Sequence, residues 1–243
     1  MSQIYFLNHK LYDLVLSVGE AVYQTLVYDN RYKFILEGLF NTIIIALFAV
    51  ILGTVIGVLV ALIRNNYDRN NKMKILNFIA KWYVDIIRGT PIVLQLMIIY
   101  YVVFKSVDVS VVLVGILAFG INSGAYVSEI IRAGIQSIPI GQTEAGYALG
   151  LKYNQIMRYI VLPQAFKNIL PALGNEFITL VKETSIGAYI GIIELTKASD
   201  IIASRTYDYF FPLILVAIIY LIITLGLSKG VQKLERKLNH ARS

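Results

Sequence analysis

Polar residues recur at helical spacing inside the apolar segments of this sequence. Asn122, Tyr126 and Glu129 share a sector of about 60° if their segment is a helix, because successive residues lie about 100° apart. A second sector of about 60°, after the loop 136–155, contains Gln164, Asn168, Asn175, Thr179 and Lys182. A polar group in a bilayer costs several kcal/mol unless it is satisfied. With Gln95 in a third apolar segment, these faces predict a shared, water-filled pathway for a solute.

Each of these residues also has a purely structural interpretation. Amide side chains can bridge helices in a tight bundle, and Glu129 with Arg132 can form an i,i+3 ion pair. The segment 182–185 contains both charges that a zwitterion needs, but it is equally compatible with a solvated helix end. The residues predicted to line the solute pathway are Gln95, Asn122, Ser123, Tyr126, Glu129, Asn168, Asn175, Lys182, Glu183, Thr184 and Ser185.

The composition indicates a membrane protein. Of the 243 residues, 57% are hydrophobic and 15% are charged, which is too little polar surface for a soluble globule and too apolar for a disordered chain. The chain lacks Cys, and its two histidines, His9 and His240, lie near the termini. We therefore expect no metal site and no cofactor. The net charge of +7 is spread beside apolar runs, which favours membrane anchoring over nucleic-acid binding.

Five apolar segments are long enough to cross a bilayer, which needs about 20 residues. The first, residues 38–63, is uncharged, and its Gly53 and Gly57 allow a neighbouring backbone to approach closely. The second is broken at Arg88-Gly89-Thr90-Pro91, where Pro removes a backbone donor. Residues 11–27 show a polar stripe typical of an interfacial helix. The five predicted spans are residues 38–63, 75–104, 111–134, 156–181 and 208–228.

The distribution of Lys and Arg predicts the orientation. Segments 64–74, 132–158 and 229–243 contain four, three and five of them, whereas Lys105 is alone in its short loop. By the positive-inside rule these three segments, and so the C-terminus, are cytoplasmic. The predicted organisation is an interfacial segment at 1–33, a transmembrane domain at 34–230 and a basic cytoplasmic tail at 231–243.

The loop 136–155 is predicted to contain a short helix. Thr143 suits an N-cap, Glu144 suits the positive start of a helix, and Gly150 suits its end. A helix of about two turns is marginal alone, so it must pack on its own bundle or on another protein. No Gly is followed by Lys, and the chain therefore lacks a phosphate-binding P-loop. Energy for uphill transport must come from an ion gradient or from a separate subunit.

The same loop resembles the Glu-Ala-Ala motif of bacterial ABC-importer permeases. Glu144-Ala145-Gly146, Gly150 and Ile160-Val161-Leu162-Pro163 match the spacing of that signature, with Gly146 where Ala is usual. Within residues 34–228 the chain is more specifically similar to polar amino acid permeases. The segments that carry this resemblance are Arg88-Gly89-Thr90-Pro91 with Gln95, Ala125 to Arg132, Gly141 to Glu144, Leu162 to Ala165, and Lys182-Glu183-Thr184-Ser185.

The resemblance implies an all-α integral membrane protein with five transmembrane helices, in the cytoplasmic membrane of a bacterium. It implies a permease subunit rather than an enzyme, which works with two cytoplasmic ATPase subunits, a second permease copy or paralogue, and an extracytoplasmic binding protein that delivers a polar amino acid. The short helix would couple the ATPase to transport. The residues assigned to that contact are Thr143, Glu144, Ala145, Gly146, Ala148, Leu149 and Gly150.

Two other functions remain open on the sequence. A stand-alone, ion-gradient-driven amino acid transporter would explain the polar faces but not the capped helix. A membrane scaffold would use the polar residues only to join helices. A membrane enzyme is disfavoured because no pair of nucleophile and base is visible in the sequence.

Overall fold

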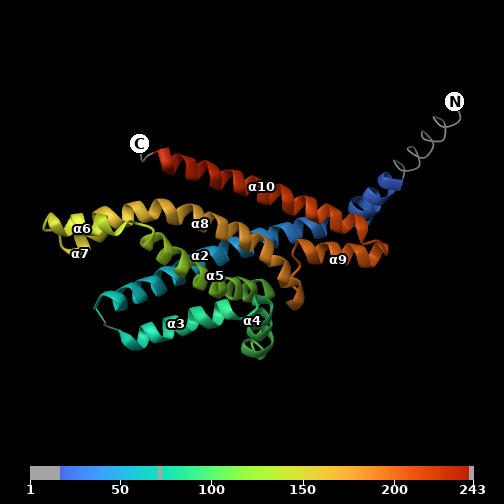
Figure 1. Cartoon of the computed structure of the whole chain (residues 1–243). Coiled ribbons are helices and arrows are strands. Elements are labelled where there is room, and N and C mark those ends of the chain that lie inside the picture. The colour runs from blue at the N-terminus through green and yellow to red at the C-terminus, as the bar shows by residue number, and fades with distance from the viewer. Residues whose placement is uncertain (1–16, 71–72, 241–243) are drawn as a thin grey trace.

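The computed structural model describes residues 17–70 and 73–240, and this part of the chain consists of helices and short connections without a strand (Figure 1). Its centre is an apolar core that joins helices distant in sequence. Ile45, Leu96, Phe119, Leu180 and Ile192 are fully or almost fully buried and belong to one cluster. Burial of this kind is what holds a bundle of separate helices in a single arrangement.

The longest helix, α2 (Tyr32–Asn70), packs along α5 (Val111–Gln136). The close approach predicted at Gly53 and Gly57 is confirmed. A Cβ atom at Gly53 would lie 2.8 Å from Cβ of Ser123, and one at Gly57 would lie 2.5 Å from Cγ1 of Val127. The expectation that α2 ends at the basic residue Arg64 is wrong, because residues 64–70 contain no Gly or Pro and the helix continues to Asn70.

We expect Gly57→Ala to destabilise the chain by about 1–3 kcal/mol, the usual cost of overpacking. The added Cβ would also lie 2.9 Å from the backbone nitrogen of Ser128, which cannot rotate away. Thermal unfolding in detergent measures the effect. The matched control is Gly226→Ala in another helix, where a Cβ meets nothing within 4 Å. Equal midpoints for the two variants would contradict the close approach of α2 and α5.

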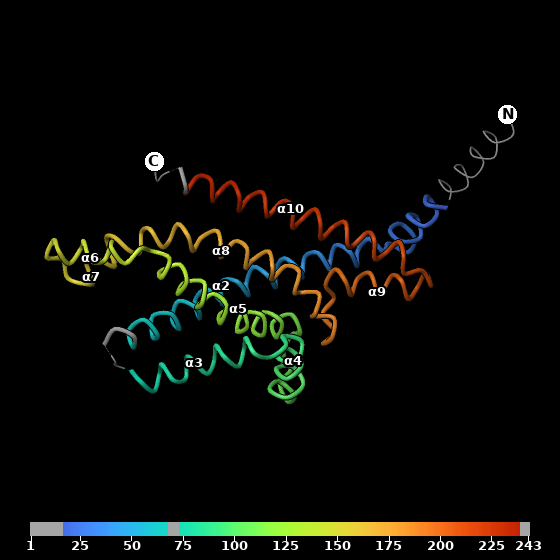
Figure 2. Tube along the Cα trace, viewed as in Figure 1, coloured from blue at the N-terminus to red at the C-terminus, as the bar shows by residue number. Residues whose placement is uncertain are grey.

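The predicted break in the second apolar segment is confirmed. The helix α3 (Lys74–Gly89) is followed by α4 (Ile92–Ile98) and the π-helical turn η3 (Ile99–Val103), and the chain bends by 110° between them. Figure 2 shows the trace turning at this point. Pro91 occupies the position before α4 in an extended conformation, which ends the preceding helix.

The fourth and fifth predicted spans correspond to α8 (Leu162–Glu183) and α10 (Phe210–His240). A π-helical turn, η4 (Met157–Val161), leads into α8, and Pro171 lies inside it. In the described residues three helices, α2, α5 and α10, are long and apolar enough to span a membrane, or four segments if α3 with α4 and η3 counts as one. The predicted count of five is therefore not confirmed. The charged residues of α8 are Lys167, Glu176, Lys182 and Glu183.

The connection between α8 and α10 contains the 3₁₀ helix η5 (Thr184–Ile190) and the helix α9 (Leu195–Thr206). Glu194 is fully buried and caps α9, because its carboxylate accepts 2.7 Å hydrogen bonds from the backbone N–H groups of Thr196 and Lys197. The hydroxyl of Tyr220 in α10 donates a 3.0 Å hydrogen bond to the same carboxylate. A buried carboxylate thus fixes α9 to α10.

Only part of the predicted interfacial segment falls in the described residues. Residues 17–22 are helical and continue into η1 (Tyr23–Val27) and η2 (Tyr28–Asn30), and the amide of Gln24 donates a 3.0 Å hydrogen bond to Glu20 on the same polar stripe. Residues 1–16 lie outside the described part. The helix α10 runs through the predicted boundary at residue 231 to His240, and residues 241–243 of the predicted tail lie outside the described part.

Two short helices, α6 (Ile140–Ala148) and α7 (Tyr153–Ile156), lie together at one end of the bundle (Figure 1). The prediction that Thr143 caps the short helix is wrong, because the helix begins directly after Pro139 and Thr143 lies within it. The first N–H groups of a helix have no partner within the helix, and Pro139 has no N–H group, so a helix can begin directly after it. The predicted end is confirmed: Gly150 has a φ of 75°, a left-handed conformation that favours glycine.

Candidate functional site

A cluster of charged side chains surrounds Glu129 of α5. Its carboxylate is paired with Arg64 of α2, with Arg132 of its own helix at 2.6 Å, and with Arg88 of α3 at 3.8 Å. The i,i+3 pair of Glu129 with Arg132 that the sequence allowed is therefore present. Because the side chain of Glu129 is only 17% exposed, one carboxylate stands close to three guanidinium groups in a poorly solvated place. The cluster connects three helices and has an excess of positive charge.

A cavity of about 350 Å³ lies beside this cluster. It is open to the outside of the subunit and is lined by Arg88, Tyr126, Glu129 and Arg132, and by Glu176 of α8. The guanidinium of Arg88 lies 5.5 Å from the centre of the Tyr126 ring, within the range of a cation–π interaction. The cavity thus presents guanidinium groups, carboxylates and an aromatic face together, which is the set of groups that a zwitterion with a polar side chain requires.

Glu176 was missed by the sequence analysis. It follows Asn175, and the sector drawn through the amide residues of this helix leaves it on another face. Its carboxylate accepts a 2.7 Å hydrogen bond from the hydroxyl of Ser123 on α5. A carboxylate in an apolar segment is itself a signal for function, because an unsatisfied charge there is costly. That signal was available from the sequence.

Gln95 and Asn122 meet, as expected for two polar faces that converge. The amide of Asn122 donates a 2.8 Å hydrogen bond to the side-chain oxygen of Gln95. Gln95 in turn donates to the backbone oxygen of Ile87 and to the hydroxyl of Thr90, both at 2.8 Å. This network fixes the bend between α3 and α4 against α5. It supports the interpretation that Gln95 and Asn122 bridge helices. Both residues are nevertheless near, in sequence, to residues that line the cavity, Arg88 and Tyr126.

Asn168 and the segment 182–185 are not among the residues that line this cavity. Asn168 donates a 2.7 Å hydrogen bond to the hydroxyl of Ser137, near the end of α5 that precedes α6. The segment 182–185 lies at the opposite end of α8, where Thr184 is buried and donates to the backbone oxygen of Val181. The polar sector of α8 therefore extends along the bundle instead of forming one site.

The short helix α6 has a buried and an exposed face. Gly146 is buried against the chain that leads into α8, and a Cβ atom there would lie 2.7 Å from Cγ1 of Ile156. This contact gives a physical reason for Gly where Ala is usual in the motif. Leu149 is 78% exposed, and the other exposed side chains of this surface are Ile140, Glu144, Ala145, Tyr147 and Ala148. An apolar surface with one carboxylate is typical of a protein contact.

Comparison with protein families places most of the chain in a known family. Residues 53–240 match the model described as "Binding-protein-dependent transport system inner membrane component". This range includes the charge cluster, the cavity and the short helix α6.

Similar proteins and structures cover most of the chain. The "Putative glutamine transport system permease protein GlnP" of Rickettsia bellii is 44% identical over 87% of this chain and 95% of its own. The "Arginine transport system permease protein ArtQ" of Bacillus subtilis is 41% identical over 84% of this chain and 92% of its own. A crystal structure of an amino acid ABC transporter with histidines matches with a TM-score of 0.79 and 42% identity, over 85% of this chain and 94% of the other.

Proposed function

Because the chain belongs to the family of binding-protein-dependent transport system inner membrane components, we propose that it is the membrane-spanning permease subunit of an ATP-driven importer for a polar amino acid. It is a multi-pass protein of the bacterial inner membrane and a transport subunit. The relatives named for glutamine and arginine, and the amino acid ABC transporter structure, support an ATP-driven importer over an ion-gradient-driven transporter.

The observation that carries the substrate class is the pair of opposite charges in the 350 Å³ cavity. In this proposal Arg88 or Arg132 holds the α-carboxylate, because guanidinium groups bind carboxylates with two hydrogen bonds. Glu176 binds the α-ammonium or a basic side chain of the substrate. The ring of Tyr126 contacts the same cation through a cation–π interaction. Gln95, Asn122 and Ser123 position these groups, while Asn168, Asn175 and residues 182–185 extend the polar path along α8.

We expect Glu176→Gln to lower uptake about 10- to 100-fold, because a hydrogen bond to a charged group is worth about 1.5–3 kcal/mol. Gln preserves the acceptor for Ser123, so packing between α5 and α8 stays intact. Uptake of a labelled substrate at several concentrations measures the effect. Glu235→Gln, which removes a carboxylate from an exposed position of α10, is the matched control. Wild-type uptake by Glu176→Gln would remove Glu176 from the pathway.

The ATPase contact is assigned to the exposed face of α6. The residues that would touch the ATPase are Glu144, Ala145, Ala148 and Leu149. Gly146 packs the helix against its own bundle, and Thr143 and Gly150 lie at the two ends of the contact. In this arrangement two ATPase subunits close beneath two permease copies. α10 has only 11% of its most apolar stretch buried inside the subunit, against 61% for α5, which leaves a face for the second copy or for lipid.

The end of the bundle that carries α6 and the last turns of α10 is proposed to be cytoplasmic, since the basic segments gather there. The end that carries α9 and residues 17–30 then faces the outside, where a binding protein would deliver the amino acid.

Reconstitution tests the function. The chain is placed in proteoliposomes with an ATPase subunit and a binding protein of an amino acid ABC importer, and uptake of labelled glutamine and arginine is measured. Uptake that requires both partners and ATP inside supports the proposal. Uptake by the chain alone, driven by a proton or sodium gradient, would instead show a secondary transporter.

A further inference from the structure

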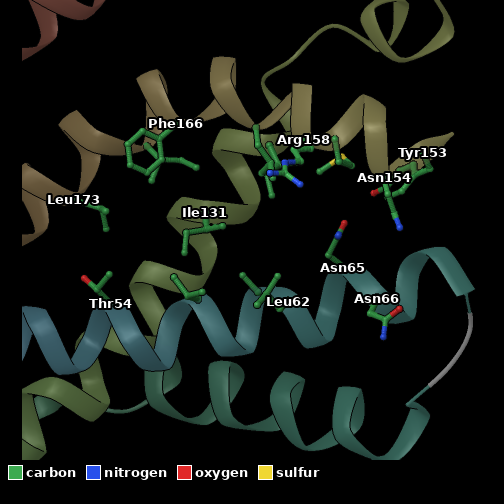
Figure 3. Close-up of a pocket in the computed structure, with 16 residues that line it drawn as sticks. Thr54, Leu62, Asn65, Asn66, Ile131, Tyr153, Asn154, Arg158, Phe166 and Leu173 are labelled. Carbon is green, nitrogen blue, oxygen red and sulfur yellow. The ribbon is translucent and has the colours of Figure 1, made fainter. Parts of the chain in front are cut away.

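A second cavity, near the proposed cytoplasmic end, is separate from the charge cluster. It has a volume of about 620 Å³ and lies between α2 and α8, with α5 behind it (Figure 3). Three helical stripes form its walls. Val58 and Leu62 come from α2, Ile131 and Ile135 from α5, and Phe166 with three further residues from α8. A volume of this size is typical of a ligand site.

The groove is apolar along most of its length and polar at one end. Leu62 and Ile131 line its middle, Asn65 and Asn154 lie toward the end near α7, and Arg158 lies between the middle and that end (Figure 3). None of its lining residues is acidic, and Arg158 has no ion pair with a side chain that the structure describes. The groove thus offers the guanidinium of Arg158 and the amide of Asn65 without an acidic residue in its lining, which suits an anion.

The groove is also open sideways and has the length of one leaflet. Leu62 is 60% exposed and Phe166 is 57% exposed, so the walls are open toward the outside of this subunit. Along α2 the lining extends from Thr54 to Asn66, a rise of about 18 Å at about 1.5 Å per residue. Half of a hydrocarbon core of about 30 Å is about 15 Å. An acyl chain that enters from the inner leaflet would therefore fit between mid-membrane and the polar end.

We propose that this groove binds an anionic phospholipid of the inner leaflet, with one acyl chain between α2 and α8 and the phosphodiester beside Arg158. Positive side chains that line pockets on the cytoplasmic side favour anionic head groups. The inference rests on the orientation proposed above. A lipid held here would contact both α8, which carries Glu176, and the chain that supports α6.

Native mass spectrometry of the purified full chain tests the proposal, with phosphatidylglycerol and phosphatidylcholine of the same acyl chains as probes. We expect about one tightly held phosphatidylglycerol per chain and at least fivefold weaker retention of phosphatidylcholine. Arg158→Gln, at an exposed position, should lower phosphatidylglycerol retention at least fivefold, and Leu62→Trp should do the same by filling the groove. The controls Leu59→Trp and Lys233→Gln should retain it as the wild type does.

Three results would overturn the proposal. Equal retention of the two lipids would remove the anion site, and unchanged retention in both groove variants would place the lipid elsewhere. Conversion of a dimer into monomers by Leu62→Trp, with unchanged retention, would assign the groove to a second copy. The orientation is tested separately by labelling Gly141→Cys in intact cells with an impermeant maleimide, since the chain lacks Cys. Labelling would refute the proposed orientation whether or not the groove binds lipid.

Discussion

Glu144→Arg is expected to lower ATP-driven uptake at least about tenfold while ATP hydrolysis by the assembled transporter continues. Glu144 is exposed on α6, so reversal of its charge leaves the packing of this helix on the bundle unchanged. Like charges brought together across an interface cost several kcal/mol. A weakened contact would separate the ATPase cycle from the movement of the permease. Uptake and phosphate release are measured in the same proteoliposomes.

The matched control for this variant is Glu235→Arg, which makes the same charge reversal at an exposed position of α10. It should transport at the wild-type rate. Thermal unfolding of both variants in detergent should also match the wild type, since neither position is buried. If Glu144→Arg transports at the wild-type rate, α6 does not couple ATP hydrolysis to uptake, even though its exposed surface is apolar.

Glu129→Gln is expected to destabilise the folded chain by about 3 kcal/mol. Removal of one partner from a poorly solvated ion pair leaves the other charges uncompensated, which costs about 3–5 kcal/mol when burial is complete. Here the carboxylate faces Arg64, Arg88 and Arg132, and these guanidinium groups would repel one another once it is neutral. The value is reduced because Arg88 and Arg132 are 44% and 39% exposed.

The double variant Glu129→Gln with Arg64→Gln distinguishes two causes of the destabilisation. These are repulsion between the guanidinium groups and the loss of hydrogen bonds to the Glu129 carboxylate. We expect it to recover part of the stability, because it removes the least exposed of the three arginines, at 24%. Chemical unfolding of all variants in one detergent gives the coupling free energy. A double variant less stable than either single variant would show that hydrogen bonding, and not charge balance, dominates this cluster.

The long apolar elements could be predicted from the sequence, but their ends could not. Residues 38–63 are uncharged and allow no other interpretation, and the close packing at Gly53 and Gly57 followed from residue size. The predicted span ends at residue 63, directly before the charged Arg64, whereas α2 continues to Asn70. Arg64 instead binds Glu129, a partner 65 residues away, and the helix continues. Local patterns contain no information about such a partner.

The candidate site shows the same limit. Tyr126 and Glu129 were found because they repeat at helical spacing within α5. Glu176 has no such repeat; a carboxylate in an apolar segment is a signal that the sequence offers, but its partner Ser123 on α5 is visible only in the structure. The role of Thr143 was misjudged because cap preference alone does not decide where a helix starts, and Pro139 fixes the start of α6 four residues earlier. Which helix faces which is decided by packing across the whole bundle.

The burial of Gly146 has a consequence for how force would pass through the subunit. A side chain of any size there would collide with Ile156, so α6 and the first turns toward α8 have no room to slide and must travel as one rigid body. Farther along, inside α8, the backbone can yield at Pro171, which lacks the hydrogen bond of an ordinary helical residue. Glu176 lies beyond it. A displacement of α6 by the ATPase would then change the angle of α8 at Pro171. The proposed ATPase contact lies on one side of that bend and the proposed substrate ligand Glu176 on the other.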